Sequence, residues 1–252
     1  MRPEERARQR IDKMLRESGW PVQHMDESNL GVSLGIAIRE FPLSKGHADY
    51  LLFLDRKAAG VIEAKPEGTT LSGVAEQTQS YMINIPNNLP SVSNPLPYAY
   101  ETTGIETYFR YIRDPYSRSR RVYSFHRPET LFDWLSLKYS LRTRLTKLST
   151  GYPLIERGLR DCQIEAIKNL EESLGMSRPR SLIQMATGSG KTFTAVSFVY
   201  RLIRYAKAKR ILFLVDRKTL GVQAHTAFQN YITPDDGRKF TELYNVQHLT
   251  TN

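Results

Sequence analysis

The sequence predicts an α/β protein in two parts, a mixed α+β part and a second part in which strands and helices alternate. The chain has 252 residues, which is room for one or two domains. Short apolar runs of strand character are common before residue 150, whereas strand and helix patterns alternate after it. Because such alternation is typical of βαβ units, we expect one domain over residues 1–150 and another over residues 151–252.

The composition limits the class of protein. Apolar residues make up 40% and charged residues 25% of the chain, which is typical of a globular protein. No run of 18 apolar residues and no secretory signal pattern occurs, so we expect no membrane partner. A single cysteine, Cys162, fits the reducing cytoplasm, and a net charge of +10 favours a polyanionic partner.

In the first part, a helix is predicted over residues 3–18, because apolar residues recur on one face before Gly19 and Pro21. The remaining patterns predict strands and helices in succession. They are a β-prone run over 31–41, a hairpin of 48–55 and 60–65 with a longer loop at 56–59, a helix over 74–85, a surface loop over 86–97, strands over 98–100 and 106–112, and a helix over 128–147.

In the second part, helical patterns alternate with two short apolar runs. Helices are predicted over residues 160–174, 191–206 and 220–231, and strands over 181–185 and 210–215. The run at 210–215 is continuously apolar after its first residue, as expected of a parallel strand covered on both faces.

Positive charge is concentrated between Arg110 and Lys147. Ten basic residues stand against three acidic ones in this window, so it carries +7, and tyrosines and phenylalanines lie among the first of them. The pattern is typical of a surface that contacts a phosphate backbone. A solvated strand face followed by a charged helix would give the same pattern.

Residues 185–192, MATGSGKT, lie between a predicted strand and a predicted helix. In that context glycines let backbone N–H groups face phosphate oxygens at a helix N-terminus. Lys191 would reach the β- and γ-phosphates of ATP, and the Thr192 hydroxyl would coordinate Mg²⁺. The predicted ATP-binding residues of the loop are Thr187, Gly188, Ser189, Gly190, Lys191 and Thr192.

This loop resembles the form used by superfamily-two helicases and translocases, in which the first glycine, here replaced by Met185, is commonly absent. Gln163 lies in a segment that resembles the adenine-recognising glutamine motif of these motors, and its amide offers the donor and acceptor that an adenine edge requires. No DEAD-type acidic motif follows residue 216. We therefore expect a fragment of a motor, which alone does not hydrolyse ATP.

Two carboxylates and an ammonium in the predicted hairpin indicate a metal site. Glu63 and Lys65 are two residues apart in a strand and project from one face, and Asp49 opens the neighbouring strand. Two carboxylates with a backbone carbonyl suit Mg²⁺, and Lys65 would orient water or neutralise developing charge. A surface hairpin with an ion pair is the alternative interpretation.

The next predicted helix places Gln77 and Tyr81 at positions i and i+4, on one face. This pair, following the Glu63-x-Lys65 strand, resembles an additional motif of PD-(D/E)xK nucleases. The resemblance implies that both side chains join the catalytic set.

The combination of these motifs resembles the motor and restriction subunit of Type I restriction-modification enzymes. The residues that carry it run from Ile11 to Arg217 and include both constellations above, together with His126. The resemblance implies a PD-(D/E)xK nuclease-like α+β domain, followed by an incomplete RecA-like parallel α/β lobe. It also implies Mg²⁺-dependent cleavage of unmodified double-stranded DNA, ATP-driven translocation, and assembly with methylation and specificity subunits.

Two other hypotheses remain open from the residues alone. One is a helicase-like motor whose N-terminal domain only binds nucleic acid or partners. The other is a repair or RNA helicase with an unrelated N-terminal domain.

Overall fold

The computed structural model describes residues 3–178 and 180–249. The chain forms two compact units, Met1–Lys138 and Tyr139–Asn252. The first unit therefore ends before residue 150, where the sequence places its domain border.

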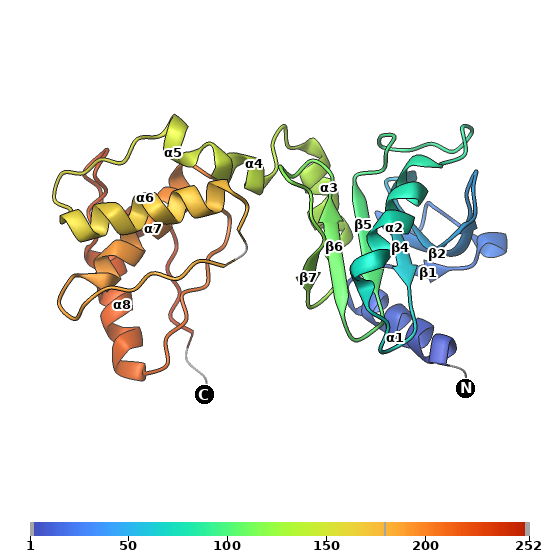
Figure 1. Ribbon diagram of the computed structural model, residues 1–252, viewed down its shortest axis with the longest axis horizontal. Coiled ribbons are helices and arrows are strands. Elements are labelled where there is room, and N and C mark those ends of the chain that lie inside the picture. The colour runs from blue at the N-terminus through green and yellow to red at the C-terminus, as the bar shows by residue number, and fades with distance from the viewer. Residues whose placement is uncertain (1–2, 179, 250–252) are drawn as a thin grey trace. The chain divides into compact units, whose positions relative to one another are not determined.

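A seven-stranded mixed sheet forms the centre of the first unit (Figure 1), with its strands in sequential order. The pairs β1–β2 and β4–β5 are parallel, and the other neighbours are antiparallel. The strands are β1 (Val22–Gln23), β2 (Gly35–Pro42), β3 (His47–Leu54), β4 (Lys57–Ala64), β5 (Tyr98–Thr102), β6 (Thr107–Tyr111) and β7 (Arg120–Val122).

Helices cover both faces of this sheet. Because successive residues of a strand point to opposite faces, one strand contributes to the apolar cluster on each side. Ile11 and Leu15 of α1 (Pro3–Glu17) share a buried apolar cluster with Tyr50 of β3. Met82 of α2 (Val74–Ile83) shares a second cluster with Leu51, the next residue of β3. The unit also contains α3 (Pro128–Ser136) and the short 3₁₀ turns η1 (Met25–Glu27) and η2 (Leu71–Gly73).

The predicted elements of the first unit are confirmed apart from two details. The hairpin loop is shorter than expected, because Asp55 and Arg56 both adopt left-handed backbone angles (φ 47° and 65°) and close a tight turn. The predicted helix over 128–147 is interrupted, because α3 ends at Ser136 and a new helix starts after Ser140, whose hydroxyl accepts the Thr143 N–H at 3.2 Å.

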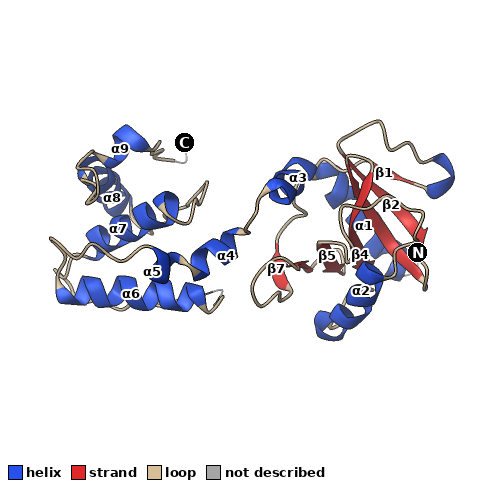
Figure 2. Cartoon of the chain, turned by 90° about the horizontal axis from the view of Figure 1, so that it is seen from above, coloured by secondary structure: helices blue, strands red, loops and turns tan. Residues whose placement is uncertain are grey.

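The second unit is built from helices around its own apolar core (Figure 2). Val196 and Tyr200 pack with Phe228 and Phe240 there. The helices are α4 (Leu141–Thr146), α5 (Leu148–Gly151), α6 (Asp161–Gly175), α7 (Lys191–Arg204), α8 (Lys218–Asn230) and α9 (Phe240–Leu243). The three helices that the sequence predicts here are thus confirmed.

The two strands predicted for the second unit are wrong. Residues 181–185 and 210–215 belong to no strand, and Leu182, Leu212 and Leu214 are 92%, 74% and 84% exposed. An apolar run becomes a strand only when a neighbouring backbone completes its hydrogen bonds. Within the described residues of this unit the only β-pairing is the isolated bridge between Ile232 and Lys239. The expected parallel sheet of a RecA-like lobe is therefore not formed.

No helix among the described residues combines the length and the apolar character that crossing a membrane requires.

Candidate functional site

The β3–β4 hairpin brings Asp49 and Glu63 to the same face of the sheet. Asp49 is two residues from Leu51 in β3, and Glu63 is two residues from Val61 in β4, so each pair points to one face of the sheet. Leu51 and Val61 belong to the apolar cluster on the α2 side. The Asp49 Oδ2 atom accepts the backbone N–H of Ala64 at 2.8 Å. This bond fixes the Asp49 carboxylate beside the end of β4.

Glu63 is the buried member of the site. Its side chain is almost fully enclosed, and its Oε1 atom accepts a hydrogen bond from Lys65 Nζ at 2.6 Å. Its Oε2 atom is buried and has no partner among the described residues. Burial raises the pKa of Glu63, the Lys65 ammonium opposes this rise, and the Asp49 carboxylate adds to it.

Hydrogen bonds extend the site from the sheet to α2. Lys65 Nζ also donates to Gln77 Oε1 at 3.1 Å, and Gln77 Nε2 donates to the Tyr81 hydroxyl at 2.7 Å. Gln77 and Tyr81 are neighbours because they are one helical turn apart. The structure thus brings together all five residues that the sequence analysis proposed for catalysis.

Arg8 of α1 is a member of this site that the sequence analysis did not identify. Its Nη2 atom lies 3.2 Å from Asp49 Oδ1, and its Nη1 atom contacts Glu40. Because 41 residues separate Arg8 from Asp49, no local pattern could reveal this pair.

A buried ion pair next to the site was also missed. Glu101 of β5 is the register partner of Glu63, so both point to the same face. Its Oε1 atom lies 3.4 Å from Arg110 Nη2, whereas its Oε2 atom is buried without a partner. Glu101 directly follows the strand predicted over residues 98–100, so the sequence analysis did not place it in the sheet, and its burial depends on the tertiary structure.

The residues at Asp49 and Glu63 fit a hard divalent cation. Two carboxylates supply oxygen ligands, and the unpartnered Glu63 Oε2 lacks the hydrogen bond that a buried oxygen normally has. No group of three or more His, Cys, Asp or Glu side chains suited to a metal occurs among the described residues. An ion here would therefore also need backbone oxygen or water.

The nucleotide loop of the second unit leads directly into α7, as the sequence predicts, but the strand predicted before it is absent. Gly188 and Gly190 have φ values of 80° and 84°, a region that disfavours other residues. Lys191 begins α7, and its Nζ donates to the Ala186 carbonyl at 3.1 Å, so the ammonium folds over the loop. Thr192, the residue predicted to coordinate the Mg²⁺ of ATP, follows in the first turn of α7. It belongs to the second unit, whereas Asp49 and Glu63 belong to the first.

Gln163 packs against this loop instead of standing free. Its Oε1 atom accepts the Arg160 N–H at 2.9 Å, and its Nε2 atom donates to the Ser189 carbonyl at 3.1 Å. A Cβ atom on Gly190 would lie 2.3 Å from Gln163 Nε2. The side chain therefore supports the loop, and recognition of adenine by Gln163 stays a prediction.

The basic residues between Arg110 and Lys147 belong to both units. They are divided between the two units, and several bind protein atoms instead of facing solvent. Arg120 Nη1 lies 2.9 Å from Asp114 Oδ2, and Arg144 Nε donates to the Ala206 carbonyl at 2.7 Å. Arg118 is exposed.

Comparison with known proteins places these constellations in two family models. Residues 32–93 match the second domain of the Type I restriction enzyme EcoKI endonuclease subunit. Residues 156–251 match the res subunit of Type III restriction enzymes. The first range contains the five residues of the hairpin site, and the second contains Gln163 and the nucleotide loop.

Individual proteins similar to this chain were also found. The chain is 29% identical over 300 residues to the EcoKI endonuclease subunit of Escherichia coli (strain K12), which covers 98% of this chain and 25% of that protein. It is 38% identical over 91 residues to the EcoAI endonuclease subunit of Escherichia coli, which covers 34% of this chain and 11% of that protein. A solved fragment assigned to the HsdR subunit of a type I restriction enzyme from Vibrio vulnificus YJ016 is 23% identical, covers 83% of this chain and 39% of that chain, and has a TM-score of 0.41.

The chain thus spans about a quarter of the length of the first of these relatives. The resemblance to the endonuclease subunit of Type I restriction enzymes, which the motifs indicate, is confirmed by the matches.

Proposed function

We propose that residues 3–138 form the Mg²⁺-dependent DNA endonuclease domain of a Type I restriction enzyme subunit. One observation carries this proposal. Asp49, Glu63 and Lys65 meet on one face of a hairpin, and hydrogen bonds continue from Lys65 to Gln77 and Tyr81. A polar network of this kind, with a buried and unpartnered carboxylate oxygen, has no evident structural purpose in an apolar strand.

The chain supplies binding groups and one positioned cation to this reaction. Asp49 and Glu63 would hold Mg²⁺, which stabilises charge on the scissile phosphate and makes an attacking water more acidic. Lys65, held between Glu63 Oε1 and Gln77 Oε1, points its ammonium at a fixed place where it would neutralise developing charge. Gln77 and Tyr81 fix the position of Lys65 from α2.

The second unit would provide the start of an ATP-dependent translocase. The loop over 187–192 supports binding of ATP phosphates, because its glycines and Lys191 lie at the N-terminus of α7. With the family resemblance, this indicates double-stranded DNA as substrate and methylation and specificity subunits as partners. The complete enzyme would cleave unmodified DNA only while the motor hydrolyses ATP.

The test compares variants in the complete enzyme with its partner subunits. We expect Asp49→Asn or Lys65→Ala to reduce Mg²⁺-dependent cleavage of unmodified plasmid DNA by about 100-fold or more, because the first removes the charge of a proposed metal ligand and the second removes the cation that would stabilise charge on the reacting phosphate. ATP hydrolysis should stay within about twofold of the unmodified enzyme. Gel analysis and phosphate release measure the two activities.

Glu76→Gln is the matched control, because it likewise converts an acid to its amide, at an exposed position of α2 beside Gln77. It should retain full cleavage. Unchanged cleavage by the Asp49 variant would refute the assignment of the site.

A second candidate is a motor whose first unit only binds DNA or partners. The salt bridge of Arg8 with Asp49 favours this candidate, because a charge partner other than a metal already contacts the carboxylate. Saturable Mg²⁺ or Mn²⁺ binding that disappears in Asp49→Asn would exclude a purely docking role.

A further inference from the structure

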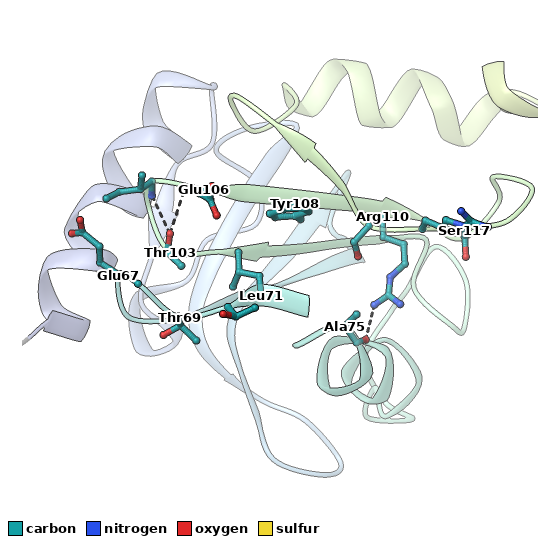
Figure 3. A pocket seen from close by; sticks show the side chains of 14 residues that line it. Glu67, Thr69, Leu71, Ala75, Thr103, Glu106, Tyr108, Arg110 and Ser117 are labelled. Carbon is teal, nitrogen blue, oxygen red and sulfur yellow. Dashed lines mark hydrogen bonds between the residues drawn. The ribbon is translucent and has the colours of Figure 1, made fainter. Parts of the chain in front are cut away.

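A groove of the first unit lies outside the five-residue site. It has a volume of about 870 Å³ and lies between the segment that leads into α2, the strand β6 and the residues just before β7 (Figure 3). Glu67 and Glu106 are drawn at one end, Tyr108 near the middle, and Arg110 and Ser117 toward the other end. The groove is thus accessible, elongated and lined mainly by polar residues.

The sheet register connects this groove to the proposed metal site. Glu63 pairs with Glu101, Glu101 pairs with Tyr108, and Tyr108 pairs with Arg121. Paired residues of neighbouring strands share a face and lie about 5 Å apart. Tyr108 in the groove is therefore about 10 Å from Glu63, on the same face of the sheet.

Acidic residues line one end of the groove and basic residues line the other end. Its two acidic residues are paired, because Glu67 lies 2.9 Å from Arg10 and Glu106 lies 3.3 Å from Arg121. At the other end Arg118 is exposed and no ion pair of it is found among the described residues. The positive charge of this end is therefore available to a ligand.

Two groups that line the basic end lack hydrogen-bond partners although they are buried. Arg110 is only 8% exposed, and its Nη2 atom donates to the Ala75 carbonyl at 2.8 Å, which holds the guanidinium at the groove. Its Nε atom has no partner in the described part of the chain, and neither has the Ser119 hydroxyl. Arg110 also pairs with Glu101, whose Oε1 atom lies 3.4 Å from Arg110 Nη2. Buried polar groups are normally satisfied, so the unpartnered Arg110 Nε and Ser119 hydroxyl leave hydrogen-bonding capacity for an acceptor at this end of the groove.

We propose that this groove holds the phosphodiester backbone of the DNA strand beside the scissile phosphate. Arg118 contacts phosphates, Arg110 and Ser119 support them from the floor of the groove, and Tyr108 packs against a sugar or base. This inference rests on the proposed nuclease function, because it takes the position of the scissile phosphate from Asp49 and Glu63. The proposal places the DNA strand on the face of the sheet that α2 covers.

Binding of a fluorescent oligonucleotide to the full chain in EDTA tests this path without cleavage. We expect Arg118→Glu to weaken binding at least fivefold for both duplex and single-stranded forms of one sequence. The slope of log affinity against log salt for the duplex should become shallower by about 0.9, the value for one lost phosphate contact. Lys57→Glu, which reverses an exposed cation at the far end of β4, is the control and should stay within twofold.

Cross-linking gives a second measurement that does not depend on a charge change. Ser117→Cys in a Cys162→Ser background, carrying a photoreactive group, should cross-link to the oligonucleotide, whereas Lys57→Cys in the same background should not. Binding within twofold for Arg118→Glu, or cross-linking no stronger than that of Lys57→Cys, would overturn the proposal.

The two proposals fail separately. Asp49→Asn should bind DNA in EDTA as the unmodified chain does, so its cleavage assay tests only the metal site. Loss of binding in Arg118→Glu alongside persisting cleavage in Asp49→Asn would retain the groove and reject the nuclease assignment.

Discussion

At the scale of single residues, burial decides what an ionisable side chain does. His126 lies within the motif that carries the family resemblance, and it packs against the ring of Trp134 with a centroid separation of 5.0 Å. Its Nδ1 atom lies 2.7 Å from the Tyr100 hydroxyl. Burial, with a smaller contribution from Arg120, lowers the pKa of His126 to about 4. His126 is therefore a partly buried residue that packs against the aromatic side of the core.

This shift predicts a pH dependence of stability. The pKa of His126 is about 4 in the folded chain and 6.5 ordinarily. As pH falls from 6.5 towards 4 the unfolded chain takes up the proton first, so the free energy of unfolding falls. We expect a loss of about 2–3 kcal/mol between pH 7 and pH 4.5 that is absent from His126→Gln.

Urea unfolding followed by tryptophan fluorescence measures this difference. Both tryptophans, Trp20 and Trp134, lie in the first unit, and the Trp20 Nε1 atom donates to the His126 carbonyl at 2.8 Å. If the two proteins lost the same stability over this pH range, His126 would not be a buried neutral group.

At the scale of elements, close packing of β4 against β5 fixes the site. A Cβ atom on Gly60 would lie 2.8 Å from the Tyr98 carbonyl oxygen, and backbone cannot move away as a flexible side chain could. Because β4 carries Glu63 and pairs it with Glu101, any shift of β4 displaces the proposed metal ligand. Glycine at position 60 is therefore required by the approach of two backbones.

We expect Gly60→Ala to reduce the free energy of unfolding of the first unit by about 2 kcal/mol, a typical cost of overpacking. It should also reduce cleavage in the complete enzyme, because Glu63 moves with β4. Gly73→Ala is the control, since no atom lies within 4 Å of the added Cβ, and its effect should stay below about 0.5 kcal/mol. Equal stability of the two variants in urea titrations would contradict this packing.

At the scale of the whole molecule, the two units differ in how they use their apolar runs. The first unit buries its central strands β3, β4 and β5 between helices, with Tyr50, Ile62 and Tyr100 in one core cluster. The second unit buries one helical core but leaves residues 181–185 and 210–215 without strand pairing. Apolar character alone thus did not make these segments part of a core.

This difference predicts that shortening an apolar side chain lowers the free energy of unfolding by different amounts in the exposed segments and in the helical core. Leu214→Ala should change the free energy of unfolding by less than about 0.5 kcal/mol, because the side chain is 84% exposed. Val196→Ala, at a fully buried position of α7, should cost about 2 kcal/mol. Circular dichroism during urea unfolding compares them, and a cost for Leu214→Ala as large as that for Val196→Ala would show that the segment is buried.

The sequence by itself determined the long helices α1, α2, α6, α7 and α8, the strands β2 to β6 and the five residues of the candidate site, but not the short strands β1 and β7 or the break after α3. The predicted features depend on local periodicity and on spacings of two and four residues, which a strand or a helix converts directly into a shared face. The tertiary structure alone decided the partners from distant segments, among them Arg8 beside Asp49 and Glu101 beside Glu63. It also decided that residues 181–185 and 210–215 are not strands. The physical reason is that strand pairing, burial and long-range ion pairs depend on which segments meet, and a local pattern carries no information about its neighbours in space.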